Sequence, residues 1–554
     1  MTADEAVRSP SSSSKRDDRA AWFFLALAWF ATIGAYSLFD PDEGRYAEIP
    51  REMWVSGDWI TPMLNGLPYF EKPILQYWVT AALYSVFGVS EVVSRLFAFA
   101  TAFACLPLVF WLARGLNQSR EIAWRAVFFL AVSPFFVLVG HINLLDQAFT
   151  LFVLIALTAF LHAQDATPVR RSQLLVVAWI ALAAAVLSKG IAAFVLTGGA
   201  LVLHALVHRE LGFLARIWSL PGFLIFWVIV LPWFLLVEQR NPGFSEFFFL
   251  HEHFARFFTK VHRRDGPLWY FVPILLLAIL PMFGTWREGL ARAWREPHAT
   301  PSFPAVRFLV LWCAFVFVFF SVSQSKLPPY LLSVIPPLVL LLARAVDDDT
   351  RASRRALVIQ TGIILLGVIA MLMFDRRRDG VVDPPVYWAC GVSVTAIVVA
   401  WFLRWWRQPT TQHAAWMPVA LAAMFAWQGL LAAYAILPPE RSSRDLVQDI
   451  GSQISPATRL YSVRQYRHSL SFYLGRTLTL VDYKGELEEG LRRVGDTSPP
   501  RYIDDLHSFV EAWNAERDAV AFIEPEALTE LQALGFSGRR LASDDPRSVV
   551  MARR

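Results

Sequence analysis

Residues 39–72 read FDPDEGRYAEIPREMWVSGDWITPMLNGLPYFEK, and they directly follow the first long apolar run of the chain. This stretch is the densest early cluster of carboxylate, basic and aromatic side chains. Its first charges, from Asp40 to Glu52, lie within about one to three helical turns of the predicted membrane surface. So much chemistry at the point where a chain leaves a bilayer indicates an active site at the headgroup level. The alternative is a solvated loop or an interfacial anchor.

The composition indicates a membrane protein with many spans. Of the 554 residues, 56% are hydrophobic, 22 are Trp and 44 are Phe, and the mean hydropathy of +0.42 is well above that of soluble domains. Runs with few or no charges recur at residues 22–39, 96–113, 126–142, 143–163, 173–188, 190–207, 217–237, 268–286, 305–323, 328–343, 356–374, 385–403 and 414–437. Each is near the ~20 residues that a helix needs to cross a bilayer. We therefore predict an α-helical polytopic membrane protein with about 13 transmembrane helices.

The N-terminal region is predicted to be anchored and uncleaved. The first run is longer than the apolar part of a signal peptide and has no A-x-A-like cleavage site. Residues 1–20 are Ser-rich and have the composition of a disordered cytoplasmic tail. Residues 74–88 are apolar but short and carry Gln76, so we expect an interfacial helix there. If this segment spans the bilayer, the number of spans changes by one.

Arginine placement predicts the orientation, because short cytoplasmic loops are enriched in Lys and Arg. Alternate connections between the apolar runs hold arginines, and we assign these connections to the cytoplasm with the N-terminal tail. The arginines are Arg114, Arg120, Arg125, Arg170, Arg171, Arg209, Arg216, Arg287, Arg292, Arg295, Arg351, Arg354, Arg355, Arg404 and Arg407. Residues 375–380, DRRRDG, fall on the opposite side and are the exception. An odd number of spans places the C-terminus outside the cytoplasm.

The apolar runs stop at Pro438 and Pro439, where sequence of soluble character begins. We predict a transmembrane domain at 21–437, with outer loops at 40–90 and 239–267, and a soluble periplasmic α/β domain at 438–554. Short strands are predicted at 459–464, 477–482, 519–525 and 547–553, and helices at 502–516 and 526–535. We find no nucleophile motif, phosphate loop or metal spacing in this domain. We therefore expect it to be a structural or acceptor-docking cap.

Nearly all polar groups that packing does not explain fall on the outer side of this topology. They are Asp42, Glu43, Arg45, Glu71, Lys72, Asp146, Lys189, His251, Glu252, His253, Arg256 and Lys326. A transporter places ionisable residues near the bilayer midplane, whereas the interiors of these predicted spans are almost bare of charge. The one-sided distribution favours an outward-facing catalytic cavity that takes a lipid-linked substrate. It argues against a transporter of lipid-linked sugars.

Three of these outer residues interrupt apolar sequence. Asp146 lies just inside the fourth run, where a carboxylate costs a few kcal/mol unless it is paired or reaches the surface. Lys189 and Lys326 each break an apolar hairpin, and the second is followed by two prolines and Tyr330. The alternative interpretations are a carboxylate that caps a helix or reaches the interface, and lysines that belong to ordinary turns.

Residues 247–273, FFFLHEHFARFFTKVHRRDGPLWYFVP, interleave aromatic and basic side chains. This composition is typical of an interfacial amphipathic helix. The functional interpretation is a groove for a phosphate and a prenyl tail, because Arg binds phosphate through two hydrogen bonds. Glu71 with His251 or His253 offers oxygen and nitrogen ligands for a divalent, zinc-like cation, although no tight ligand spacing supports it. No other cofactor is indicated.

The chain resembles the bacterial aminoarabinose transferases that modify lipid A, which are related to protein O-mannosyltransferases within the C-type glycosyltransferase superfamily. The resemblance covers most of residues 20–345. It rests on Asp146 and on the motifs DPDEGRYAEIPREM (40–53), SGDWITPMLNGLPYFEKPILQYW (56–78), LSKG (187–190), EHFARFFTKVHRRDGPLWYFVP (252–273) and SKLPPYLLSVIPP (325–337). The later runs and the C-terminal domain match in layout more than in residues.

The resemblance implies an inner-membrane enzyme that uses a polyprenyl-phosphate sugar on the periplasmic side. Asp42 matches the central catalytic carboxylate of the first outer loop, and Asp146 matches a second acidic residue at the outer end of a span. The donor phosphate and sugar site takes Arg45, Tyr46, Tyr69, Lys72, Lys189, Arg256 and Tyr330 from the same resemblance.

Transfer of a sugar from undecaprenyl phosphate to a phosphate of lipid A is the function that this resemblance implies. The leaving phosphate needs positive charge in the transition state, which Lys72 and Arg256 would supply. A one-step displacement would invert the anomeric centre, and Asp42 would orient the sugar or the acceptor. The expected partners are the lipid-linked donor, lipid A and membrane lipids, and no nucleic acid. A related transferase with another sugar or acceptor, such as a protein, is the alternative.

Overall fold

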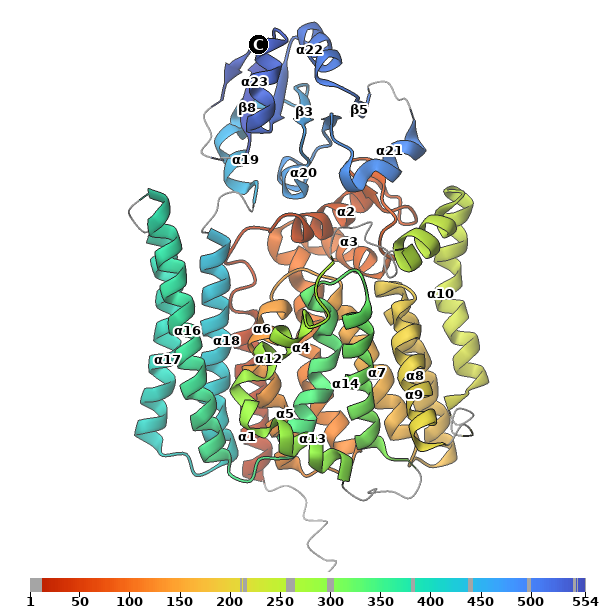
Figure 1. Cartoon of the computed structure of the whole chain (residues 1–554), viewed down its shortest axis with the longest axis vertical. Coiled ribbons are helices and arrows are strands. Elements are labelled where there is room, and N and C mark those ends of the chain that lie inside the picture. The colour runs from red at the N-terminus through yellow and green to blue at the C-terminus, as the bar shows by residue number, and fades with distance from the viewer. Residues whose placement is uncertain are drawn as a thin grey trace, which may run out of the picture.

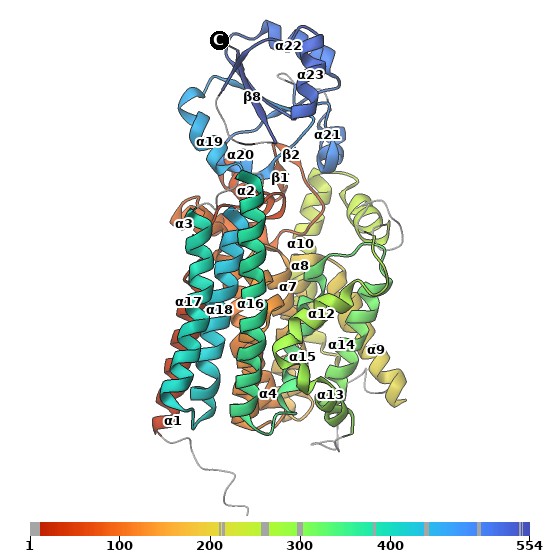
Figure 2. The same cartoon turned by 60° about the vertical axis from the view of Figure 1, so that its left-hand side comes forward.

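The computed structural model describes residues 12–209, 212, 217–255, 265–295, 303–379, 384–436, 442–495, 500–541, 545 and 547–553. Two parts are visible in Figure 1 and Figure 2: a tall bundle of helices, and a smaller domain of strands and helices at one end of it. The C-terminus lies in the smaller domain. We call the described residues 442–553 the outer domain.

Nine helices of the described residues are long and apolar enough to cross a membrane. They are α4 (Glu91–Gly115), α7 (Asp146–Ala163), α8 (Pro168–Lys189), α10 (Leu220–Arg240), the broken helix α12–η4–α13 (Phe271–Ile279, Leu280–Thr285, Trp286–Arg295), α14 (Ala305–Val322), α16 (Asp349–Asp379), α17 (Pro384–Arg407) and α18 (Gln412–Ile436). The bent pair α5 (Arg120–Val132) and α6 (Pro134–Gly140) makes a tenth if it counts as one span.

The other three predicted runs also overlap helices of the bundle. They are α1 (Ser12–Phe30), α9 (Ala192–His208) and η5–α15 (Pro328–Val334, Ile335–Ala343). The last two are shorter than 18 residues, and the first half of α1 is rich in charge. The polytopic helical fold class is confirmed, and these short or charged helices account for the difference between ten candidate spans and about 13 predicted ones.

The predicted run at 126–142 is not one straight helix. α5 and α6 meet at Ser133 with a bend of 66°. Pro134 has no backbone N–H to continue the helix, and the Ser133 hydroxyl donates to the Ala278 carbonyl at 2.8 Å. Proline chemistry therefore breaks this span in the interior of the bundle.

The first outer loop is folded rather than extended. It contains α2 (Asp42–Ser56), the hairpin of β1 (Met63–Leu64) and β2 (Leu67–Pro68), and α3 (Leu75–Phe87). Gly57 caps the C-terminal end of α2, and its φ of 72° is a conformation that glycine adopts without strain. Both helices lie across the end of the bundle, below the outer domain (Figure 1). The arrangement of α3 agrees with the prediction of a short helix that does not span.

A buried ion pair fastens α2 to the bundle. Arg95 of α4 donates from Nε and Nη2 to the two carboxylate oxygens of Glu43, at 2.9 and 2.8 Å. Both side chains are fully buried. Glu43 also accepts the backbone N–H of Asn143 at 2.8 Å. Since Glu43 follows Asp42 directly, this pair holds the start of α2 in place beside the start of α7.

The outer domain is an α/β fold built on one mixed sheet. Its order is β5-β4-β3-β6-β8-β7, in which β5, β4, β3 and β6 run parallel and β8 and β7 run antiparallel to their neighbours. The strands are β3 (Arg459–Val463), β4 (Thr479–Val481), β5 (Tyr502–Ile503), β6 (Ala519–Ile523), β7 (Arg539–Arg540) and β8 (Val549–Arg553). The helices are α19 (Arg444–Ile450), η7 (Gly451–Gln453), α20 (His468–Leu474), η8 (Gly485–Leu487), α21 (Glu488–Val494), α22 (Leu506–Ala515) and α23 (Pro525–Ala533).

The predicted strands of this domain coincide with β3, β4, β6 and β8. The predicted helix at 502–516 is partly wrong, because its first two residues form β5. α19, α20 and α21 have only seven residues each. Such short helices show too few turns for an apolar period to be visible.

Candidate active site

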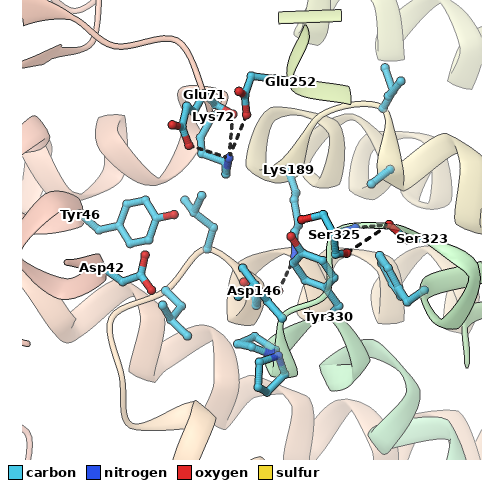
Figure 3. Close-up of a pocket in the computed structure, with 18 of the residues that line it drawn as sticks. Asp42, Tyr46, Glu71, Lys72, Asp146, Lys189, Glu252, Ser323, Ser325 and Tyr330 are labelled. Atoms are coloured by element: carbon cyan, nitrogen blue, oxygen red, sulfur yellow. Dashed lines mark hydrogen bonds and ion pairs between the residues drawn. The ribbon is translucent and has the colours of Figure 1, made fainter. Parts of the chain in front are cut away.

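A cavity of about 420 Å³ lies where the first outer loop meets the bundle. α2, the segment after β2, the ends of α7, α8, α9 and α14, the π-helical segment η3 (Glu246–Ala255) and η5 supply its walls. Figure 3 shows Asp42 and Tyr46 on one side, Lys189 and Tyr330 on the other, and Lys72 with two carboxylates above them. The lining residues are Asp42, Arg45, Tyr46, Glu71, Lys72, Leu144, Leu145, Asp146, Lys189, Ile191, Ala192, Val195, Glu252, Phe319, Phe320, Ser323, Ser325, Leu327, Pro328, Pro329 and Tyr330.

Asp42 is the most exposed of the ion-paired groups in this cavity. Its side chain is 46% exposed, against 4% for its partner Arg45, which donates from Nη2 to Asp42 Oδ1. Asp42 is also the first residue of α2, where the partial positive charge of the helix N-terminus stabilises a carboxylate. The structure therefore presents a fixed carboxylate to the space where a substrate would bind.

Arg45 holds this corner of the cavity together. Its Nη1 donates to the Tyr69 hydroxyl at 2.9 Å and to Glu486 at 2.5 Å. Burial alone would lower the pKa of Arg45, but Glu486 and the neighbouring tyrosines raise it well above its usual value. Arg45 is therefore a permanent cation.

Tyr46 and Tyr69 both lie near Arg45, whose guanidinium carbon is 5.2 Å and 5.9 Å from their ring centres. Burial raises the pKa of both hydroxyls well above 10, and Arg45 opposes the shift. Both side chains are neutral hydrogen-bonding groups at physiological pH. Tyr46 lines the cavity, whereas Tyr69 acts from behind it through Arg45.

Asp146 and Lys189 form an ion pair on the opposite wall. Asp146 is the first residue of α7, and Lys189 is the last residue of α8. The Lys189 ammonium also lies 4.4 Å from the Tyr330 ring centre, a cation–π distance. The structure thus brings together Asp146, predicted at the outer end of a span, with Lys189 and Tyr330 from two separate predicted hairpins.

Lys72 lies between two carboxylates. Its Nζ is 3.6 Å from Glu71 and 3.8 Å from Glu252, and it donates to the Glu71 carbonyl at 2.9 Å. These ion-pair distances are long, so an incoming phosphate would compete for Lys72 on favourable terms. Its place beside the cavity fits the predicted phosphate contact.

Glu71 and His251, the predicted metal ligands, are connected through this cluster. His251 Nδ1 lies 3.4 Å from Glu252 Oε1, and its side chain is 46% exposed. Among the described residues no group of three or more His, Cys, Asp or Glu side chains is arranged around one point. The two residues supply the nitrogen and oxygen donors that a zinc-like ion takes, and the metal site stays a prediction.

Arg256, the remaining predicted site residue, lies outside the described residues, as does the side chain of His253. The site residues that the sequence assigned to the first loop, to the start of the fourth run and to the two hairpins line one cavity, except Tyr69, which lies behind it. Their chemical roles remain predictions.

Two contributors to the site were missed in the sequence. Arg95 fixes the start of α2 through Glu43. Glu486 of the outer domain reaches Arg45, and its other carboxylate oxygen pairs with His468. The sequence around Glu486 does not indicate this contact, because Arg45 and Glu486 are 441 positions apart.

Two family models match the chain. The model described as dolichyl-phosphate-mannose-protein mannosyltransferase matches residues 21–248, and the aminoarabinose transferase C-terminal domain matches residues 446–553. With the helical bundle and the charged cavity at its end, they place the chain in the class of multi-span membrane glycosyltransferases.

Similar proteins define the family more narrowly. The undecaprenyl phosphate-α-4-amino-4-deoxy-L-arabinose arabinosyl transferase of Pseudomonas paraeruginosa is 30% identical over 525 residues, which cover 90% of this chain and 92% of that protein. The crystal structure of ArnT from Cupriavidus metallidurans bound to undecaprenyl phosphate has a TM-score of 0.85 at 30% identity, and 98% of each chain is covered. Its apo structure has a TM-score of 0.84 at 29% identity. The chain belongs to the family of undecaprenyl phosphate-α-4-amino-4-deoxy-L-arabinose arabinosyl transferases.

Proposed function

We propose that this chain transfers 4-amino-4-deoxy-L-arabinose from undecaprenyl phosphate to a phosphate of lipid A, on the periplasmic face of the bacterial inner membrane. Relatives across nearly the whole chain are named for this donor and sugar. The similar Cupriavidus structure contains undecaprenyl phosphate. The lipid A acceptor and the periplasmic side are the parts of the proposal that these relatives do not supply.

The observation that carries the proposal is the amphiphilic cavity. Its lining combines charged side chains, among them Asp42, Lys72, Asp146 and Lys189, with apolar ones, among them Ile191, Val195, Phe319 and Phe320. A polyprenyl phosphate sugar has the same combination, since an apolar chain meets a phosphate and a polar ring. The cavity can bury the reacting end of such a donor while the prenyl chain remains in lipid.

The lining contains carboxylates that could bind the ammonium group of an amino sugar. Among the described lining residues, four carboxylates, Asp42, Glu71, Asp146 and Glu252, face three cations, Arg45, Lys72 and Lys189. The ammonium group of 4-amino-4-deoxy-arabinose adds a positive charge that one of these carboxylates would stabilise. The donor phosphate would take over Lys72, and a carboxylate released from Lys72 would be available to the ammonium group.

The proposed reaction is a single displacement. An oxygen of the acceptor phosphate attacks the anomeric carbon, the bond from that carbon to the donor phosphate breaks, and undecaprenyl phosphate leaves with the bonding electrons. Lys72 stabilises the leaving phosphate, and Asp42 orients the sugar and stabilises positive charge at the anomeric carbon. A phosphate acceptor is already ionised at neutral pH, so no strong general base is needed.

The two ends of the molecule support the proposed orientation. α13, which carries Arg287, Arg292 and Arg295, lies at the end of the bundle away from the outer domain (Figure 1). Arginines gather on the cytoplasmic side of membrane proteins. The cavity and the outer domain would then face the periplasm, where the headgroup of a lipopolysaccharide precursor is exposed.

Transfer to a protein is the second candidate, because the mannosyltransferase family model matches residues 21–248. Mass spectrometry of lipid A and of membrane glycoproteins, from cells with the chain, without it and with Asp42→Asn, separates the two. We expect lipid A to carry aminoarabinose only with the unchanged chain. A sugar found on proteins and not on lipid A would overturn the proposed acceptor.

A further inference from the structure

A second cavity, of about 690 Å³, lies between the far end of α2 and the outer domain. Residues of α2 and the β1–β2 hairpin form one wall, and residues around β3, β4 and β5 form the other. They include Arg51, Glu52, Gly66, Arg459, Arg476, Thr477, Thr479 and Arg501. We call it the arginine cavity, because four arginines and a single carboxylate line it.

Three of these arginines, Arg459, Arg476 and Arg501, form no ion pair with a carboxylate in the part of the chain that the structure describes. Arg51 is paired with Glu48, at 2.6 Å from both Nε and Nη2. Within the described part of the chain, no carboxylate lies within 4.0 Å of the guanidinium of Arg476 or Arg501. Asp518 attracts Arg476 from a longer distance, but among the described residues the cavity holds more positive than negative charge.

Arg476 and Arg501 are nevertheless held in fixed positions. Arg476 donates from Nη1 to the Ser455 carbonyl at 2.9 Å and from Nη2 to the Thr458 carbonyl at 2.7 Å. Arg501 donates from Nη1 to the Thr477 hydroxyl at 2.7 Å, and its guanidinium lies so close to Gly66 that a Cβ there would be 3.0 Å away. Cations fixed in this way lose little entropy when they bind an anion.

The arginine cavity is connected to the active site by one rigid element. Arg51 lies nine residues after Asp42 in α2, which corresponds to about 14 Å along a helix. An acceptor made of linked sugars, with anionic groups at more than one point, can reach both places at once. A free phosphate or a single-headgroup lipid cannot.

We propose that the arginine cavity binds a second phosphate on the sugar headgroup of the acceptor glycolipid, while the first phosphate receives the sugar at Asp42. The inference rests on the proposed function. Arg476 and Arg501 supply the charge-assisted hydrogen bonds. The cavity determines how tightly the acceptor binds and which of its phosphates reaches Asp42, and it does not change the rate of the chemical step.

The test is equilibrium binding of diphosphoryl and monophosphoryl lipid A to the full chain in nanodiscs, without a sugar donor. The unchanged chain should bind the diphosphoryl form about tenfold more tightly. The double substitution Arg476→Gln with Arg501→Gln should abolish this preference, and Arg501→Lys should retain part of it. Arg540→Gln, on the exposed strand at the opposite edge of the sheet, is the matched control and should retain it fully.

Binding of undecaprenyl phosphate reports whether each variant is folded, and it should be unchanged in all of them. An equal preference in the double variant and the unchanged chain would overturn the arginine cavity as the phosphate site. The proposal would also be overturned if the double substitution weakened binding of phosphatidylglycerol as much as binding of lipid A. The same holds if one concentration of inorganic phosphate removed the preference in every variant that shows it. The proposed function is tested separately, by a transfer assay with the unchanged chain. The binding experiment contains no sugar donor, so its result does not depend on the outcome of the transfer assay.

Discussion

At the scale of single residues, Asp42 combines exposure with a fixed position, since its carboxylate is 46% exposed and is held by Arg45. Asp42→Asn keeps the size of the side chain and removes its charge. We expect turnover to fall about 100-fold or more, with no change in melting temperature. A membrane transfer assay measures this, and Asp58→Asn in the same loop is the control, because Asp58 pairs with Arg240 outside the cavity. Near-normal turnover of Asp42→Asn would remove Asp42 from the chemistry.

Lys72 is expected to act on the donor phosphate. Lys72→Ala should raise the inhibition constant of undecaprenyl phosphate about tenfold or more, because a charge-assisted hydrogen bond contributes roughly 1.5–3 kcal/mol. Arg256→Ala should have a similar effect by the family resemblance. Competition assays with undecaprenyl phosphate measure the constant. Lys484→Ala, on the exposed surface of the outer domain, should leave it unchanged. An unaltered constant in both test variants would exclude them from the phosphate site.

The divalent cation at Glu71 and His251 is testable by elemental analysis. If the ion binds there, purified protein should contain close to one equivalent, and Glu71→Gln should lose it. The physical reason is that a neutral amide oxygen is a weaker ligand than a carboxylate. Protein prepared without chelator that holds no metal would leave Glu71 as the ion-pair partner of Lys72.

At the scale of elements, apolar length predicted the bundle well, because each run must satisfy its own backbone inside lipid. The bend between α5 and α6 escaped this reasoning, since Ser133 and Pro134 were counted as part of an apolar run. In the outer domain, five-residue strands such as β3 and β6 were visible from their apolar and β-branched residues, whereas the seven-residue helix α20 was not. Local sequence patterns therefore predicted the elements that are long enough to show an apolar run or an alternation of their own.

The residues of the site also fall into two groups, those that the sequence predicted and those that it did not. Asp146 and Lys189 could be chosen because each is a charge that interrupts apolar sequence, and Asp42 and Lys72 because the charged first loop resembles the family motif. Their partners Arg95 and Glu486 could not, since each contact depends on how distant segments pack. No spacing in the chain relates Glu43 to Arg95, or Arg45 to Glu486.

α2 also carries a buried carboxylate with a predictable pH effect. Burial raises the pKa of Glu48 from 4.5 to about 8, although the bonds from Arg51 oppose the shift. The folded chain therefore holds this proton more tightly than the unfolded chain, and the stability that it contributes is lost as the pH rises through about 8. Glu48→Gln imitates the protonated group. It should melt close to the unchanged protein at pH 5 and higher by about 2 °C or more at pH 9.

Thermal unfolding in detergent at both pH values measures this difference. Glu526→Gln, on the exposed side of α23, is the control and should show no change with pH. A Glu48→Gln protein that is less stable at pH 9 than the unchanged protein would show that the ionised pair with Arg51 stabilises α2.

At the scale of the whole molecule, the outer domain is fastened to the start of α2. Ser469 of α20 donates its backbone N–H and its hydroxyl to the two oxygens of Asp40, at 2.7 and 2.6 Å. α20 approaches Gly44 so closely that a Cβ there would lie 2.5 Å from the Ser469 nitrogen. The domain that the sequence marked as a cap therefore touches the residues on both sides of Asp42.

Glu486 is the positioning residue of this contact, because it binds the cation that holds Asp42. Glu486→Gln keeps a hydrogen-bond acceptor for Arg45 but removes the charge, so Arg45 is held less firmly and Asp42 loses its orientation. We expect kcat to fall about tenfold, while the KM for the donor and the binding of undecaprenyl phosphate stay within about twofold. Glu488→Gln, an exposed neighbour two residues away, should leave both constants unchanged.

Limited proteolysis between α18 and α19 shows whether the outer domain remains docked. An unchanged kcat in a docked Glu486→Gln protein would mean that the outer domain only covers the site, and an equal rise in the donor KM would place Glu486 in donor binding instead.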